Sequence, residues 1–158
     1  TFSKEMQNAI TNYCQAGDNF FVSGAYVASD LWDNRLVKAN EEDKKFAMEV
    51  LKYKWRVGQA ARNGKVKSVA SPFPEITGSY TYYQDLNPES YVVESPDALE
   101  PAAQGAFTIL RYSENNLSAG IAYKGNYKTC VLGFPFEAIR TVTERELLMK
   151  AILTFFEH

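Results

Sequence analysis

Histidine is almost absent from this sequence, because the one histidine, His158, is the final residue. A serine or cysteine nucleophile needs a neighbouring base to take its proton, and histidine commonly serves as that base. A residue at the frayed end of a chain is poorly placed for this role. The sequence therefore argues against a self-contained Ser-His or Cys-His mechanism and favours a function in binding or scaffolding.

Excess charge of one sign and long apolar runs are also missing. The chain has 17 Lys and Arg against 19 Asp and Glu, with the two signs intermixed, so we expect no nucleic-acid partner. No apolar run approaches the roughly 20 residues that cross a bilayer, so we expect no transmembrane segment. The start, Thr1 to Lys4, has neither methionine nor a signal-peptide core, and we interpret Thr1 as a processed end or an artificial boundary.

Cysteine is scarce, whereas aromatic residues are abundant. The only two cysteines, Cys14 and Cys130, lie in apolar surroundings, and the sequence implies neither a disulfide nor two free thiols. Aromatic residues make up 14% of the chain and continue into segments expected to be loops, where they suit contact with sugars or proteins as well as core packing. With 46% apolar residues, residues 1–158 are expected to fold as a single domain.

The first half predicts an α/β arrangement. Ser3 caps a helix that Gly17 ends, and the short apolar run 19–24 has the pattern of a strand buried on both faces of a parallel sheet. A second helix is expected from Asn40 to Tyr53, with acidic residues in its first turn that complement the helix dipole.

The second half predicts mainly strands. Asn63-Gly64 supplies the positive φ angles of a β-hairpin between 57–61 and 66–70. Residues 71–101 hold five of the six prolines and predict an aromatic excursion over the sheet. Further short strands are expected at 79–83, 91–94, 107–112, 119–123 and 128–133. A final helix follows, with a capping box of Thr143 and Glu146 and an apolar face from Leu147 to Phe156.

Several segments together carry a resemblance to a known family. They are residues 21–31, 119–123, 133–139 and 145–156. These residues resemble the glutamine-amidotransferase-like domain of Bacteroidetes proteins labelled xanthan lyase or N-acetylmuramoyl-L-alanine amidase, and the resemblance covers nearly the whole chain. It implies a three-layer, flavodoxin-like α/β fold with helices on both faces of the sheet. It also implies a multidomain, polysaccharide-related protein that is secreted, periplasmic or on the cell surface, with adjacent domains as partners.

The resemblance also implies that the catalytic residues have been replaced. Amidotransferases carry a Gly-x-Cys-x-Gly turn after a buried strand and a later His-Pro-Glu. Here Ala25 falls at the nucleophile, Pro135 falls at the histidine, and only Glu137 matches. Since alanine cannot attack a carbonyl and proline cannot accept a proton, the resemblance implies a non-catalytic domain.

The family fold begins with a strand-helix-strand unit that precedes the first helix expected here. Its absence from the sequence predicts that the chain is a fragment of a larger protein with an exposed sheet edge. A second copy or the missing segment would cover that edge. An assembly module that pairs through the edge, as a homo-oligomer or with a partner strand, is therefore one alternative function.

The carboxyl ends of the strands are the usual ligand crevice of open α/β sheets. We expect Tyr26, Trp32, Phe136 and Glu137 to gather there around a carbohydrate ligand. Catalytic candidates are Glu137, Asp30, Tyr26 and Ser23. Asp30 and Glu137 suit a two-carboxylate glycosidase, Tyr26 suits the base of a lyase, and the Ser23 hydroxyl favours turn capping.

A metal site is the remaining alternative. Asp30, Asp33 and Glu137 could gather around a hard cation, but two aspartates three residues apart near a helix start are more typical of capping. We therefore predict no metal and no cofactor. The leading hypothesis is a non-catalytic amidotransferase-like domain that binds a ligand or arranges adjacent modules. The alternative enzyme is a carbohydrate lyase or hydrolase that uses Asp30, Tyr26 and Glu137.

Overall fold

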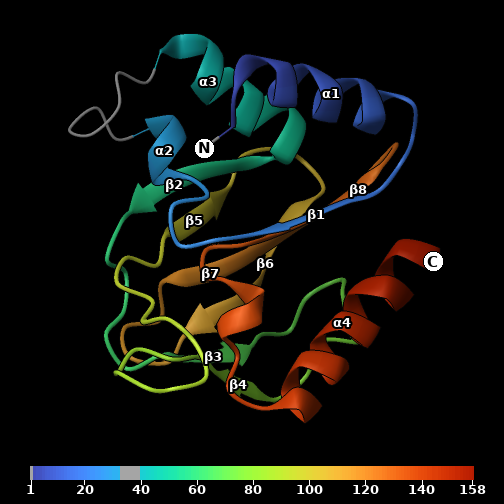
Figure 1. Cartoon of the computed structure of the whole chain (residues 1–158). Helices are drawn as coiled ribbons and strands as arrows, with labels where there is room; N and C mark the ends of the chain where they lie inside the picture. Colours follow the sequence, from blue (N-terminus) through green and yellow to red (C-terminus); the bar gives the residue numbers. More distant parts are fainter. Residues whose placement is uncertain (1, 33–39) are drawn as a thin grey trace.

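The computed structural model describes residues 2–32 and 40–158, which form a mixed α/β fold in three layers (Figure 1). The middle layer is a six-stranded sheet with the order β1-β8-β7-β6-β3-β4. Its strands are β1 (Phe20–Ser23), β3 (Lys65–Ser68), β4 (Ser79–Thr81), β6 (Ala106–Tyr112), β7 (Ser118–Lys124) and β8 (Lys128–Leu132). A separate antiparallel pair is formed by β2 (Tyr53–Val57) and β5 (Ala98–Pro101).

Helices cover both faces of this sheet (Figure 1). One face carries α1 (Lys4–Gln15), α2 (Ser29–Trp32), α3 (Glu41–Phe46), the π-helical turn Ala47–Leu51 that continues α3, and the β2–β5 pair. The other face carries α4 (Val142–Glu157) and the 3₁₀ turn Phe136–Ala138. The helices on both faces agree with the layered arrangement expected from the sequence.

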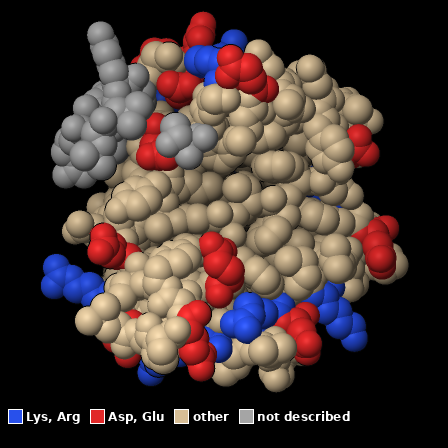
Figure 2. Space-filling model, in the orientation of Figure 1, with Lys and Arg blue, Asp and Glu red and all other residues tan. Residues whose placement is uncertain are grey.

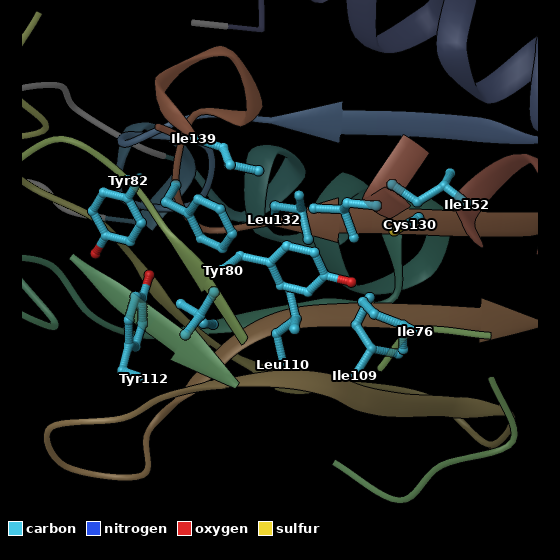
Figure 3. Close-up of a cluster of buried hydrophobic side chains, with 14 of the residues drawn as sticks. Ile76, Tyr80, Tyr82, Ile109, Leu110, Tyr112, Cys130, Leu132, Ile139 and Ile152 are labelled. Atoms are coloured by element: carbon cyan, nitrogen blue, oxygen red, sulfur yellow. The ribbon is translucent and has the colours of Figure 1, made fainter. Parts of the chain in front are cut away.

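The core on the α4 side is rich in tyrosine. Figure 3 shows the rings of Tyr80, Tyr82 and Tyr112 among aliphatic side chains of the sheet and α4. Tyr82 stacks on Phe134 at 4.9 Å between ring centroids, and Phe155 of α4 stacks on Phe73 at 4.4 Å. Most of the unusual aromatic content on this side of the sheet is therefore used for packing.

The residues at the two ends of α1 predicted its position correctly. The hydroxyl of Ser3 accepts a hydrogen bond from the Met6 amide at 3.3 Å, which caps the helix. Gly17 follows the helix with a φ of 96°, a conformation that side chains rarely adopt. The second helix ends earlier than expected, because Lys52 takes a left-handed φ of 69° and Tyr53 begins β2.

The predicted hairpin is wrong. Asn63 and Gly64 do form a turn, but β2 pairs with β5 while β3 lies between β4 and β6. Gly64 is needed here because a Cβ would lie 2.4 Å from the carbonyl oxygen of Tyr82, in addition to its φ of 62°. The Asn-Gly signal was therefore a tight turn between strands of different sheets.

The sheet is less parallel than expected. β1 and β8 are parallel, whereas each other pair of neighbours is antiparallel, because short turns join β6, β7 and β8. β1 lies at one edge and is half-buried along its length, so it is not buried on both faces. No described strand pairs with the outer side of β1.

Three further details correct the sequence analysis. Residues 91–94 form no strand, and the excursion contributes β4 to the main sheet and β5 to the smaller one. The cap of α4 is Thr141, which accepts from the Glu144 amide at 3.1 Å, and Thr143 lies inside the helix. Leu147 is 58% exposed and so lies outside the packed face of α4.

Across residues 2–32 and 40–158, no helix has the length and apolar character needed to cross a bilayer.

Candidate functional site

Two turns meet where β1 and β8 end, and they build the candidate site. The first turn runs from Gly24 to Ala28, and the second follows Leu132. The amide of Gly24 donates to the carbonyl of Leu132 at 3.2 Å, and the Ser23 hydroxyl accepts from the amide of Phe136 at 3.1 Å. Ser23 therefore fixes one turn against the other, which agrees with its expected role in turn chemistry.

A first hollow of about 350 Å³ lies between α1 and the turn after β1. Its lining residues are Phe2, Met6, Val22, Ser23, Gly24, Tyr26, Val27 and Asp30. Of the sequence-predicted candidates, Ser23, Tyr26 and Asp30 thus meet at one hollow. Most of the other lining side chains are apolar, so this hollow offers contact surface with one carboxylate.

A second hollow of about 270 Å³ lies on another side of Tyr26. Its lining residues are Gly24, Ala25, Tyr26, Tyr91, Val92, Val93, Glu94 and Pro135. The two positions that the family resemblance assigns to nucleophile and base, Ala25 and Pro135, therefore line the same hollow. Neither side chain can perform those roles.

Glu137 adjoins this second hollow through Tyr91. The Tyr91 hydroxyl donates to Oε1 of Glu137 at 2.7 Å. Burial, together with the neighbouring carboxylate of Glu137, raises the pKa of Tyr91 above its ordinary value, so its hydroxyl stays protonated and remains a donor. Tyr91 was not singled out from the sequence, because only the fold brings residues 91 and 137 together.

Asp97 is a second residue that the sequence analysis missed. Its carboxylate is fully buried and accepts four hydrogen bonds. Oδ2 accepts from the amides of Ala28 at 2.8 Å and Ser29 at 2.9 Å and from the Ser29 hydroxyl at 3.2 Å, while Oδ1 accepts from the Trp55 indole at 3.1 Å. Burial raises the pKa of Asp97 to about 6, although the hydrogen bonds from Ser29, Ala28 and Trp55 oppose the shift.

The backbone of Asp97 extends this connection to the turn after β8. Its amide donates to the carbonyl of Gly133 at 2.7 Å, and its carbonyl accepts from the Tyr112 hydroxyl at 2.7 Å. Only glycine fits at position 133, because a Cβ there would lie 2.0 Å from the Asp97 carbonyl oxygen. Asp97 therefore holds both turns of the site, and its only sequence signal is an aspartate directly before an apolar strand.

The two other aromatic residues predicted at the site pack against the cores. The ring of Phe136 meets Phe21 edge-on with centroids 6.0 Å apart and packs against the core on the α4 side. Trp32 packs against the core on the α1 side. Neither residue is among those that line the hollows. Asp33 lies outside the described residues.

Neither hollow is lined by a histidine or a cysteine within the described part of the chain. Cys14 and Cys130 are free and buried, and burial raises the pKa of both thiols, that of Cys14 to about 11. His158 follows α4, whose Phe156 carbonyl accepts from Asn19 and Lys128 at the start of β1 and β8. The C-terminus of the chain, where His158 stands, is therefore at the opposite end of these strands from the site (Figure 1).

The charges around the site are mainly negative. Asp30 and Glu94 line the first and second hollows, Glu137 adjoins the second, and neither lining includes a lysine or arginine among the described residues. Figure 2 shows one face of the molecule with mostly uncharged residues across its centre and with acidic and basic residues intermixed toward its upper and lower margins. In residues 2–32 and 40–158, no three His, Cys, Asp or Glu side chains gather closely enough to hold a metal ion.

Comparison with known proteins shows a shared fold. No protein-family model and no curated protein sequence matches the chain. The β-galactosidase from Rahnella sp. R3 matches with a TM-score of 0.63 and 13% identity, over 98% of this chain and 21% of that one. The exo-β-1,4-mannosidase Op5Man5 from Opitutaceae bacterium strain TAV5 matches with a TM-score of 0.52 and 9% identity, over 94% and 22%.

A glutamine amidotransferase from Thermotoga maritima also matches, with a TM-score of 0.49 and 14% identity, over 98% of this chain and 55% of that one. The chain spans about a fifth of the length of each glycosidase. By its fold, the chain is a three-layer α/β domain, and the two glycosidases each contain a similar fold over about a fifth of their length.

Proposed function

We propose that this chain is a flavodoxin-like, amidotransferase-like domain that binds carbohydrate without catalysing a reaction. The observation that carries the proposal is the second hollow, which is lined by Ala25 and Pro135, the two positions that the family resemblance assigns to the nucleophile and the base. The shape of this hollow is held in place by Asp97, which fixes the turns on both sides of it. A maintained hollow without reactive groups is suited to binding.

The side chains around the second hollow support a sugar as the ligand. Tyr26 and Tyr91 are 43% and 51% exposed, so part of each ring is free to stack on the apolar face of a sugar. Glu94 and Glu137 offer carboxylate oxygens that accept hydrogen bonds from hydroxyl groups. Because the charged groups here are carboxylates, neutral glycans are favoured over acidic ones.

The setting of the domain belongs to the same proposal. The names of two matched proteins are those of glycosidases, enzymes that act on sugars, and this chain matches about a fifth of each. We infer that the chain works within a larger, exported, polysaccharide-related protein, where it positions a glycan for adjacent domains.

Calorimetric titration of the purified chain tests the proposal. The ligands are neutral galacto- and manno-oligosaccharides, with xanthan and peptidoglycan fragments alongside. We expect Tyr91→Ala and Tyr26→Ala each to weaken binding by about ten-fold or more. The matched control is Tyr13→Ala, since Tyr13 is 50% exposed on α1 and lines neither hollow. Absence of binding to every glycan, or equal loss in the control, would refute the proposal.

The alternative enzyme is tested in the same samples. Tyr26 and Asp30 share the first hollow, which is the observation that favours a lyase or hydrolase. Incubation with the glycans and glutamine is followed by measurement of unsaturated sugars, reducing ends and ammonia. A product signal that disappears in Asp30→Asn or Glu137→Gln, with the fold intact, would show that the chain is an enzyme and not a binding domain.

An assembly role through β1 is the second alternative, and it is favoured by the position of β1 at the sheet edge. Measurement of mass in solution distinguishes it. A dimer that dissociates when proline replaces Phe21 would support pairing through this strand, since proline removes a backbone donor from the edge.

A further inference from the structure

A third hollow of about 280 Å³ adjoins the second one. Val92, Val93 and Glu94 line both, so this segment forms their common wall. The chemistry of the third hollow differs, because its other lining residues include Gln59, Arg62 and Gln84. An aromatic hollow thus lies next to a polar one.

Gln84 lines the third hollow, and two hydrogen bonds hold its side-chain amide in place. Its Nε2 donates to the carbonyl of Ala61 at 3.1 Å and to the carbonyl of Val93 at 2.8 Å. These two acceptors fix the orientation of the amide, because the reverse orientation would place Oε1 against two carbonyl oxygens. Oε1 is buried and has no hydrogen-bond partner among the described residues. Because Oε1 has almost no accessible surface, a ligand in this hollow reaches the exposed side chains around it.

Two exposed side chains complete the set of polar groups. Arg62 brings a guanidinium that only donates, and Glu94 brings a carboxylate that only accepts. The backbone amide of Arg62 donates to Glu114 at 2.8 Å, which fixes the position of its main chain. In the described part of the chain, no hydrogen bond or ion pair engages the guanidinium of Arg62 or the carboxylate of Glu94. Groups that both donate and accept, as sugar hydroxyls do, match this mixture of partners.

We propose that the third hollow is a second sugar subsite, so that a neutral glycan of at least two units lies across residues 92–94. One sugar ring contacts Tyr91 at the second hollow. Hydroxyl oxygens of the next unit accept from Arg62, and its hydroxyl groups donate to Glu94, beside the fixed amide of Gln84. This inference rests on the proposed carbohydrate-binding function and assigns it a minimum ligand length.

Affinity as a function of glycan length tests the subsite. The full chain is titrated with mono-, di-, tri- and tetrasaccharides of a series that binds in the first experiment. We expect about a ten-fold gain in affinity from one unit to two. Arg62→Ala should remove most of that gain and leave the affinity for the monosaccharide unchanged. The control is Arg56→Ala, because Arg56 lies on β2 and pairs with Glu100 at 3.1 Å, away from the hollows.

A second measurement observes Gln84 without altering it. The side-chain amide resonance of Gln84 should shift in nuclear magnetic resonance spectra when a disaccharide binds, but not when a monosaccharide binds at the second hollow. Equal affinities for one and two units, an Arg62→Ala variant that keeps the full gain, or an unshifted Gln84 amide would each overturn the subsite. In those cases binding that still depends on Tyr91 leaves the proposed function intact, whereas a chain that binds no glycan removes both.

Discussion

Replacing Asp97 by asparagine is expected to change how the stability of the protein depends on pH. The Asp97 carboxylate is fully buried, and its pKa rises from 3.8 to about 6 in the folded state. Its charged form is stabilised by donors on Ala28, Ser29 and Trp55, but these do not fully offset the cost of burial. Asparagine has nearly the same shape and cannot ionise.

The size of the effect follows from the pKa difference. Between pH 3.8 and about 6 the folded state keeps a proton on Asp97 that the unfolded state has released. The free energy of unfolding is therefore highest below the lower value and falls as pH rises through the higher one. A difference of about two pH units corresponds to about 3 kcal/mol, most of which is lost between pH 4 and pH 7.

Urea unfolding followed by circular dichroism at several pH values measures this effect. The side-chain amide of asparagine also brings a donor against the Trp55 indole donor, which lowers the free energy of unfolding by about 1–3 kcal/mol. That cost is the same at every pH, so it cancels from the slope. The stability of the wild type relative to Asp97→Asn should fall by about 2–3 kcal/mol from pH 4 to pH 7. Tyr53 and Tyr112 lie near Asp97, but burial raises their pKa values well above this range, so they remain neutral.

A matched variant removes a carboxylate from the surface. Glu75→Gln changes an exposed side chain, and exposed charges interact weakly with their surroundings. A difference between wild type and Asp97→Asn that stays constant with pH, or that grows as pH rises, would show that the buried carboxylate does not have the environment described here.

Three further outcomes are expected. Thr141→Ala should lower the free energy of unfolding by about 1 kcal/mol through loss of the α4 cap, whereas Thr143→Ala should have little effect, and equal effects would contradict the observed cap. Phe155→Ala should lower the free energy of unfolding in urea by about 3–5 kcal/mol, because Phe155 is 3% exposed and stacks on Phe73. The same change at the half-exposed Leu153 should lower it by less than about 0.5 kcal/mol. The two thiols should react with a disulfide reagent only after unfolding, and rapid labelling of the native protein would contradict their burial.

The sequence predicted those elements whose signals are local. The Ser3 cap and Gly17 set the ends of α1, and the turns around residues 113–116 and 124–126 set the strands on either side. Strand partners are not local. Asn63-Gly64 indicated a turn, but pairing of β2 with β5 depends on a segment about 45 residues further along the chain, and no pattern in the sequence specifies that contact.

The site was predictable to a similar extent. Tyr26 was found because it follows an apolar strand that ends at the crevice, where open sheets bind ligands. Tyr91 and Asp97 were not found, because they lie in a segment that the sequence describes only as an irregular excursion. Trp32 and Phe136 were expected at the ligand because they are aromatic, but their rings are partly buried against the two cores, and in such positions packing competes with ligand contact.

The buried charge of Asp97 also bears on whether the site is in use. At neutral pH an ionised carboxylate in this position lowers stability, and natural proteins accept such costs mainly where a functional geometry requires them. The carboxylate holds the turn that carries Tyr26, while neither Ala25 nor Pro135 has chemistry that needs the turn. If the turn is kept for binding, Asp97→Asn should weaken glycan affinity at pH 7 while its relative stability rises with pH. A variant that binds glycan as tightly as the wild type would assign Asp97 to the fold alone.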